Sequence, residues 1–293
     1  MVKIALIGAD GQLGADINSY FKEKGIKIIG LVGLKDIDVC DYRMSDDILK
    51  RINPDLVINT AAFHDVDLCE DEALSAFKVN VIGVKNLAII CREINIPLMH
   101  FSTDYIFDGK KKKPYTEYDC ARPISLYGIS KLAGEQVIQY MLEKYYIIRL
   151  SGLYGYTGCV GKGNINFVEL MIKLAKKEEA IKVVNDQVLT PTSTRDVAEK
   201  LYELIQTGNY GIYHMTNTGS CSWYEFACKI FKLMKLSTGV LPITTEEFGA
   251  KARRPKYSVL DNVNLRNIGL KDLRNWKEAL KDYIESRNEK RYL

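Results

Sequence analysis

The stretch Lys3-Ile-Ala-Leu-Ile-Gly8-Ala-Asp-Gly11-Gln-Leu-Gly14 decides the fold. A short apolar run, typical of a buried strand, leads into three glycines spaced G-x-x-G-x-x-G, and a helical pattern follows at once. Such a loop turns tightly, lets a pyrophosphate approach the backbone, and presents the N–H groups of a helix start. Three glycines alone could also form a structural turn. Their position between a strand and a helix favours a dinucleotide site.

Strand-like and helix-like segments alternate outward from this loop through the first half of the chain. Apolar strand patterns occur at 27–32, 56–60, 97–102 and 146–150, and helical patterns at 15–24, 73–93 and 130–140. Fully apolar strands separated by amphipathic helices are typical of a parallel sheet covered on both faces. We therefore predict an α/β fold with a doubly wound parallel sheet, that is, a Rossmann fold.

The second half of the chain is less regular. Helical patterns occur at 166–177, 193–206 and 223–234, a strand pattern at 212–216, and residues 241–261 show no clear period. This contrast predicts an NAD(P)-binding domain at 1–150, with returning segments near 193–220, and a smaller, discontinuous substrate-binding part mainly at 151–293.

Composition excludes several classes of protein. The 293 residues are 47% hydrophobic and 27% charged, and 41 basic against 37 acidic residues leave a net charge of only +4. This balance argues against disorder and against a nucleic-acid partner. The seven cysteines form no C-x-x-C pair, so we expect free thiols and no metal site. With no signal-peptide pattern and no apolar run long enough to span a bilayer, we expect a cytoplasmic protein without membrane contact.

The adenosine end of a dinucleotide would meet the segment after the second strand. An acidic residue at the end of that strand would bind the ribose and favour NAD, but the strand ends Leu31-Val32-Gly33. Asp38 and Val39 follow a little later, and we expect them to line the adenine site. The choice between NADH and NADPH stays open.

Tyr127 and Lys131 stand four residues apart, which places both side chains on one face of a helix. A lysine cation beside a tyrosine favours the phenolate and lowers the pKa of the phenol toward a useful range. Ser102 and Thr103 end a predicted strand, where a hydroxyl could hold a carbonyl group. A Y-x-x-x-K pair also occurs by chance on surface helices. After a glycine loop and a hydroxyl-bearing strand end, it favours a reductase site.

Together these features resemble the extended short-chain dehydrogenase/reductase family, and within it the dTDP-4-dehydrorhamnose reductase branch. The blocks S-T-D-Y-x-F-D-G, from Ser102, and N-D-Q…P-T, from Asn185, are specific to that branch. The matching blocks cover nearly the whole chain: 8–14, 59–62 with 66, 67 and 70, 80–83, 101–109, 127–135, 149–154, 185–187 with 191 and 192, and 252–255.

The resemblance implies a role for each matching residue. Tyr127 would donate a proton, Lys131 would activate Tyr127, and Thr103 would position the keto oxygen of the substrate. Asp104 and Tyr105 would face the sugar. Arg253 would bind the diphosphate of the sugar nucleotide, although a solvated basic turn is the alternative for this segment. The cofactor, NADH or NADPH, would lie against Gly8, Gly11, Gln12, Leu13, Ala61, Ala62, Phe63, Ser102, Tyr127 and Lys131.

Two departures from the family pattern concern the sugar and the assembly. Gly152 stands where some members carry a tryptophan over the sugar, which leaves the pocket more open. Some members pair their subunits through a magnesium ion held by glutamates, but here Asp16 and Arg195 occupy those positions. A homodimer stays open, whereas a magnesium-bridged one is not supported.

Three functions fit these residues. The first is NAD(P)H-dependent reduction of the C4 keto group of a nucleotide-activated deoxysugar, as in the conversion of dTDP-4-dehydrorhamnose to dTDP-L-rhamnose. The second is a sugar-nucleotide 4-epimerase, which would retain its NAD. The third is a non-catalytic cofactor-binding subunit similar to the regulatory beta subunit of methionine adenosyltransferase. The intact set of Thr103, Tyr127 and Lys131 favours the reductase.

Overall fold

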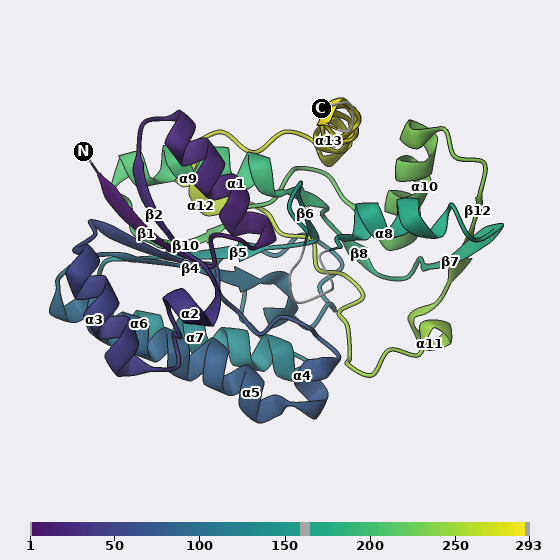
Figure 1. The fold of residues 1–293 in the computed structure, drawn as a ribbon. Helices are drawn as coiled ribbons and strands as arrows, with labels where there is room; N and C mark the ends of the chain where they lie inside the picture. The colour runs from purple at the N-terminus through teal and green to yellow at the C-terminus, as the bar shows by residue number, and fades with distance from the viewer. Residues whose placement is uncertain (1, 159–164, 291–293) are drawn as a thin grey trace.

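The computed structural model describes residues 2–158 and 165–290, and it is built on one six-stranded parallel sheet (Figure 1). The sheet order is β10-β5-β4-β3-β1-β2, and every neighbouring pair is parallel. This confirms the predicted doubly wound sheet. The strands are β1 Lys3–Ile7, β2 Lys27–Leu31, β3 Leu56–Asn59, β4 Leu98–Thr103, β5 Tyr145–Leu150 and β10 Gly211–His214.

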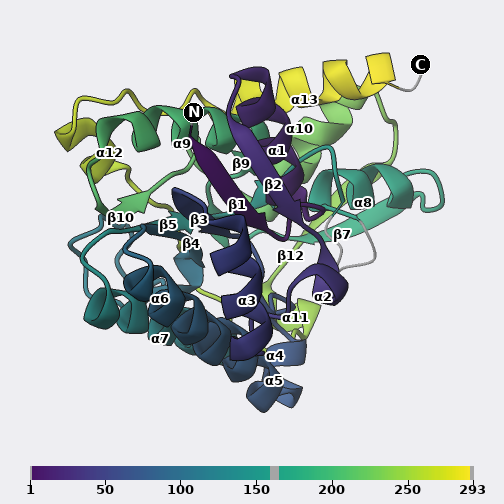
Figure 2. The ribbon, with the colours of Figure 1, turned by 60° about the vertical axis from the view of Figure 1, so that its left-hand side comes forward.

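Helices cover both faces of this sheet, because its strands are apolar on both sides (Figures 1 and 2). One face carries α1 Gln12–Glu23, α9 Thr194–Thr207 and α12 Val263–Asn267. The other face carries α3 Tyr42–Ile52, α6 Val84–Glu93 and α7 Leu126–Met141. Each face forms its own apolar core, with Ile4 and Leu6 pointing to one and Ala5 and Ile7 to the other.

A smaller lobe lies beyond one end of the sheet (Figure 1). Its apolar core contains Tyr154, Phe226 and Trp276 and is separate from the two cores of the sheet. The capping box of Ser222 and Glu225 begins its helix α10. The lobe contains α8 Phe167–Leu174, α10 Trp223–Met234, α11 Thr245–Phe248, α13 Trp276–Lys290 and the pair β7 Ala180–Val184 with β12 Gly239–Ile243.

Short elements connect these parts. Two small strand pairs join β6 to β9 and β8 to β11. The remaining elements are α2 Gly33–Asp36, α4 Leu68–Asp71, α5 Ala73–Phe77, the π-helical turn η1 Lys78–Gly83, the 3₁₀ turn η2 Asp104–Ile106, β6 Leu153–Tyr154, β8 Val188–Leu189, β9 Thr192–Ser193 and β11 Cys221–Ser222.

The sequence patterns misplaced or missed several elements. The helix predicted at 130–140 begins earlier, at Leu126, because the Ser125 hydroxyl accepts a hydrogen bond from the Gly128 N–H and caps it. Residues 241–261, which show no period, contain part of β12 and all of α11. Helices α3 and α13 were not predicted, although Asp41 is an N-cap signal for α3.

The predicted helix at 73–93 is α5, η1 and α6 in succession. It is long and apolar enough to cross a membrane by length and composition, with a mean hydropathy of 1.5, so the sequence analysis was wrong to find no apolar run of that length. Half of it is buried inside the protein. Its apolar side packs into the core that contains Val57 and Ile138, as expected of a core helix.

Chain direction across the sheet reverses between β1 and β3. From β1 the chain continues to β2 at one edge, and then crosses back to β3 on the other side of β1. At such a reversal the loops after neighbouring strands diverge and leave a crevice at the carboxyl ends of the strands, where α/β proteins bind ligands. The glycine loop after β1 opens directly onto this crevice.

Candidate functional site

A cavity of about 660 Å³ lies at the carboxyl ends of β1, β3 and β4. Phe167 and Trp223 line it from the smaller lobe. Of the site residues predicted from the sequence, all but Phe63 and Arg253 are among the described residues that line it. Those that line it are Gly8, Gly11, Gln12, Leu13, Asp38, Val39, Ala61, Ala62, Ser102, Thr103, Asp104, Tyr105, Tyr127 and Lys131.

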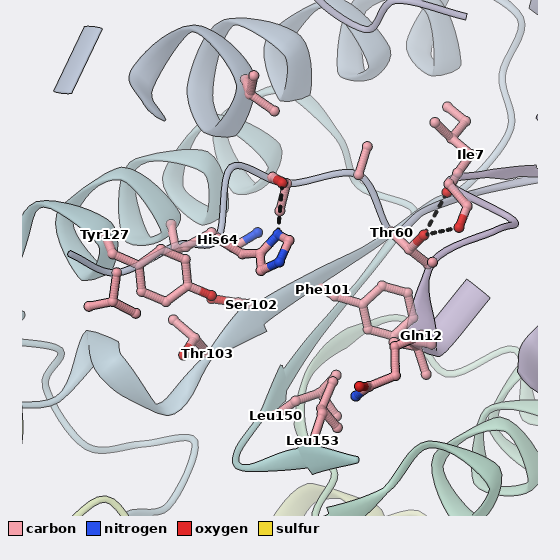
Figure 3. Close-up of a pocket in the computed structure, with 18 of the residues that line it drawn as sticks. Ile7, Gln12, Thr60, His64, Phe101, Ser102, Thr103, Tyr127, Leu150 and Leu153 are labelled. Carbon is pink, nitrogen blue, oxygen red and sulfur yellow. Dashed lines mark hydrogen bonds between the residues drawn. The ribbon is translucent and has the colours of Figure 1, made fainter. Parts of the chain in front are cut away.

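The glycine loop is packed too tightly for side chains at two of its positions. Gly8 has a φ of +77°, and a Cβ there would lie 2.5 Å from the Thr60 hydroxyl oxygen. A Cβ on Gly14 would lie 2.1 Å from the Gly8 carbonyl oxygen. The Thr60 hydroxyl bridges the turn, 2.7 Å from the carbonyl oxygen of Ile7 and 3.0 Å from that of Gly8 (Figure 3). The start of α1 is thereby held at the rim of the cavity.

Two buried polar atoms on the cavity wall have no hydrogen-bond partner among the described residues. They are Gln12 Oε1, on the first turn of α1, and Ser102 Oγ, near the end of β4. Figure 3 places the two side chains in different parts of the cavity. Because a buried polar atom without a partner is costly, these atoms suit a ligand that carries polar groups at separate points.

The loop after β3 is held by two asparagines. The Asn59 side-chain oxygen accepts a hydrogen bond from the Ala61 N–H at 3.1 Å. Asn80, in the π-helical turn η1, bonds both the N–H and the carbonyl of Phe63 at 2.9 Å, and also donates to the Ser130 hydroxyl at 3.0 Å. Both bonds from Asn80 to Phe63 engage its backbone. The π-helical turn that holds Asn80 inserts an extra residue into the helix, and such insertions often occur at functional sites.

Thr103, Tyr127 and Lys131 all line the cavity. Figure 3 shows the Tyr127 side chain reaching toward Ser102 and Thr103 at the end of β4. The Thr103 hydroxyl donates to the Asp104 carboxylate at 3.0 Å. The rings of Tyr105 and Tyr127 pack edge to face, 5.9 Å apart. The Thr103 hydroxyl and the Tyr127 phenol therefore lie together, and Lys131 lines the same cavity one helical turn after Tyr127.

Burial shifts the titration of these groups. It raises the pKa of Tyr127 above its usual range, which a hydrogen bond with Thr103 partly offsets. Burial lowers the pKa of Lys131 to about 8, and the neighbouring Glu135 carboxylate opposes this. Burial raises the pKa of Asp104 to about 6, and hydrogen bonds with Ser258, Ser151 and Thr103 oppose this shift. Perturbed groups gathered in one cavity are a common mark of a functional site.

The two late arginines have different surroundings. Arg254 is half-buried and binds the Asp67 carboxylate at 2.8 and 3.1 Å, and it also interacts with the Tyr105 hydroxyl. Arg253 is exposed, and no ion pair or hydrogen bond involves its side chain in the described part of the chain. Arg253 is therefore the freer cation, while Arg254 stabilises the wall beside Tyr105.

Several lining residues were missed by the sequence analysis. His64 follows the predicted Ala61–Phe63 segment, and Figure 3 shows its ring directed into the same cavity as the Tyr127 ring. Trp223 begins α10, far along the chain, and no local signal relates it to the glycine loop. Gly152, the position that carries a tryptophan in some family members, also lines the cavity.

The positions that hold magnesium in some family members are engaged within this chain. Asp16 accepts a hydrogen bond from the Thr194 hydroxyl, and Arg195 binds the Glu23 carboxylate at 2.6 Å. Across residues 2–158 and 165–290, no three His, Cys, Asp or Glu side chains gather closely enough to hold a metal ion.

Known proteins resemble the chain over nearly its whole length. It is 40% identical over 98% of its length to the spore coat polysaccharide biosynthesis protein SpsK of Bacillus subtilis, covering 99% of that protein. A dTDP-4-dehydrorhamnose reductase of Clostridium acetobutylicum has the same fold with a TM-score of 0.93 and 42% identity, over 98% of this chain and all of that one. The dTDP-4-dehydrorhamnose reductase of Bacillus anthracis, solved in complex with NADP, has a TM-score of 0.93 and 38% identity over the same shares.

The family model that matches describes the RmlD substrate binding domain and spans residues 2–288. It includes the glycine loop, the Thr103, Tyr127 and Lys131 set and the late arginines in one continuous match. The chain therefore belongs to the RmlD substrate binding domain family.

Proposed function

We propose that this protein is an NAD(P)H-dependent reductase that converts dTDP-4-dehydrorhamnose to dTDP-L-rhamnose by reducing the C4 keto group. The observation that carries the proposal is the meeting of Thr103, Tyr127 and Lys131 in the cavity onto which the glycine loop opens. Membership of a family whose relatives are named dTDP-4-dehydrorhamnose reductases supports the substrate.

The cavity fits a nicotinamide dinucleotide. Gly8, Gly11, Gln12 and Leu13 would hold the pyrophosphate at the N-terminus of α1. Asp38 and Val39 would line the adenine end, and Ala61, Ala62 and Ser102 the path toward the nicotinamide. Phe63 would contribute through its fixed backbone, since its side chain is outside the described lining. When bound, the reduced nicotinamide supplies the hydride.

The protein's own side chains would handle the keto oxygen. Thr103 Oγ would hold that oxygen against Tyr127, and the Tyr127 hydroxyl would protonate it as negative charge develops. Lys131, on the same face of α7 one turn later, would stabilise the phenolate that remains. Phe101 and Leu150 add apolar side chains to the wall of the same cavity, which limits competition from water.

The substrate would extend from this point toward the smaller lobe. Asp104 and Tyr105 would bind the sugar, and Arg253 would reach the diphosphate from the exposed turn before Pro255. We accordingly assign cofactor binding to residues 1–150 with returning segments near 193–220, and substrate binding mainly to residues 151–293. The packing of α12 on β10 adds residues near 263–273 to the returning segments.

We also propose a cytoplasmic location. The six cysteines among the described residues are free thiols, as is common in a reducing compartment, whereas Cys159 lies outside the described residues.

The direct test is to supply the purified protein with dTDP-4-dehydrorhamnose and either NADPH or NADH, and to follow the loss of reduced-nicotinamide absorbance. We expect stoichiometric oxidation of the nicotinamide and formation of dTDP-L-rhamnose, identified by NMR. Tyr127→Phe is the matched control for nonenzymatic oxidation. No turnover with either nicotinamide, or release of tightly retained NAD from the purified protein together with interconversion of sugar epimers, would contradict the proposal.

A further inference from the structure

Behind the reacting groups, two buried side chains that have no role above, Asn59 and His100, connect to Lys131. This chain of side chains runs from Asn59 on β3 through His100 on β4 to Lys131 on α7. Asn59 Nδ2 lies 3.2 Å from His100 Nδ1, and His100 Nε2 lies 3.2 Å from Lys131 Nζ. The three residues are 1%, 0% and 2% exposed, so all three side chains are buried.

The hydrogen-bond pattern around Asn59 decides which nitrogen of His100 carries a proton. The side-chain oxygen of Asn59 accepts from the Ala61 N–H, so its amide nitrogen must be the group that faces His100. An amide nitrogen only donates, and His100 Nδ1 must therefore accept. Burial lowers the pKa of His100 well below its usual value, so the ring is neutral and its one proton sits on Nε2.

The Nε2–H of His100 then points at the amine of Lys131. An ammonium group has three donors and no acceptor, so a protonated Lys131 cannot take this hydrogen bond. A neutral amine has a lone pair and can. The chain is thus fully satisfied only when Lys131 is uncharged, and burial lowers the pKa of Lys131 in the same direction. The other charges nearby are Glu135 on α7 and Arg149 on β5, which bind each other at 2.7 Å.

We propose that His100 is a positioning residue that donates its Nε2–H to Lys131 and stabilises Lys131 as a neutral amine within the catalytic cycle. The inference rests on the proposed reductase function. After Tyr127 has given its proton to the substrate oxygen, an N–H bond of the Lys131 ammonium breaks and the phenolate of Tyr127 gains that proton. The amine that is left accepts the hydrogen bond from His100, and a solvent proton recharges Lys131 before the next turnover.

The tautomer of His100 can be read directly by NMR of the whole protein labelled with ¹⁵N-histidine. The chain has only three histidines, and His214 is a built-in opposite control. Its Nδ1 faces the carbonyl oxygens of Tyr115 and Asp261 at 3.0 and 3.2 Å, so its proton sits on Nδ1. At a pH above 8, where Lys131 is mainly uncharged, we expect long-range ¹H–¹⁵N spectra to show Nε2–H for His100 and Nδ1–H for His214. An Nδ1–H tautomer of His100 would overturn the proposal.

A second measurement separates this role from simple packing. In protein labelled with ¹³C-lysine, the Lys131 Cε signal reports the pKa of the amine. We expect His100→Phe to raise that pKa by about one unit, because the donor that favours the neutral form is lost. His100→Gln should restore the low value, because its Oε1 can accept from Asn59 while its Nε2 donates to Lys131. An equal Lys131 pKa in wild type and His100→Phe would refute the role.

These readouts need no substrate, so they are independent of the proposed function. If the reductase assay fails and the tautomer is as expected, the proposed substrate is wrong and the His100–Lys131 pairing stands. If the enzyme reduces its substrate and His100 carries its proton on Nδ1, the pairing is wrong and the reductase function stands. Should His100→Phe fail to fold, the wild-type tautomer still decides.

Discussion

At the scale of single residues, Tyr127 is placed to act as a proton donor. Tyr127→Phe should lower kcat by about 10²–10⁴-fold, since general acid catalysis contributes that much. Cofactor affinity should be nearly unchanged, because the ring still packs on Tyr105. Steady-state kinetics and a nicotinamide titration of the same sample provide the two values. A variant that keeps more than about a tenth of kcat would assign the proton to another group.

The two arginines at 253 and 254 provide a matched pair. Arg253→Ala should raise KM for the sugar nucleotide by about ten- to a hundredfold, because a charge-assisted bond to a phosphate is lost. Arg254→Ala should change that KM less, because Arg254 already binds Asp67. KM for the nicotinamide serves as the internal control in both variants. If only Arg254→Ala raises KM for the sugar nucleotide, then Arg254 and not Arg253 binds the diphosphate.

Lys131 should make stability depend on pH in a definite direction. Its pKa is about 8 in the folded protein and near its ordinary 10.5 when unfolded. Between these values the unfolded chain binds more protons, so the contribution of Lys131 to the free energy of unfolding increases as pH rises from about 8 to about 10.5. Below pH 8, the buried charge of Lys131 lowers the free energy of unfolding by its full amount.

Lys131→Met removes this titration. The difference in free energy of unfolding, variant minus wild type, should therefore decrease as pH rises through that window, whatever constant packing change the methionine brings. Urea unfolding at several pH values from 7 to 10.5 measures the difference. A flat difference would show that Lys131 titrates normally.

At the scale of elements, we expect two glycines in the turn between β1 and α1 to have different roles. Gly14 should be needed for folding, whereas Gly11 should be needed for cofactor binding. Gly14→Ala should destabilise the protein by about 1–3 kcal/mol, because the new Cβ would lie 2.1 Å from the Gly8 carbonyl oxygen, a backbone atom. Gly11→Val should leave folding nearly intact, since a Cβ there meets the same oxygen at 3.3 Å and the backbone φ is −71°. Its side chain should instead block the pyrophosphate.

Thermal unfolding and a fluorescence titration with NADH on both variants test this contrast. We expect a lowered midpoint for Gly14→Ala and lost cofactor binding with a nearly normal midpoint for Gly11→Val. Unchanged NADH affinity in Gly11→Val would mean that the loop does not hold the phosphates.

The same elements show why local patterns predict most of the sheet and less of the second half. The buried strands of the sheet are continuous apolar runs, so their sequences alone indicate them. Strand β12 is mostly exposed and contains Pro242, and it becomes a strand by pairing with β7, whose residues lie 59 positions earlier in the chain. Such pairing leaves no periodic signal in the strand itself.

At the scale of the whole molecule, the cavity joins both parts of the chain. Trp223 lines it from α10, whereas Trp276, the other of the two tryptophans, is 3% exposed in the core of the smaller lobe. Binding of dTDP should therefore change the intrinsic fluorescence through Trp223. Trp223→Phe should abolish most of that change and Trp276→Phe should retain it. The reverse pattern would place the nucleotide away from the smaller lobe.

The sequence by itself determined the fold class, the glycine loop and the position of Tyr127 and Lys131 on one helix face. These depend on local patterns: apolar strand periodicity, glycine at a turn, and spacing on one helix face. Tertiary structure alone decided that Trp223 and His64 line the cavity, that Arg254 is bound by Asp67, and that His100 contacts Lys131. Each of these depends on which segments the folded chain brings together, and buried polar groups then have only the partners that packing leaves them.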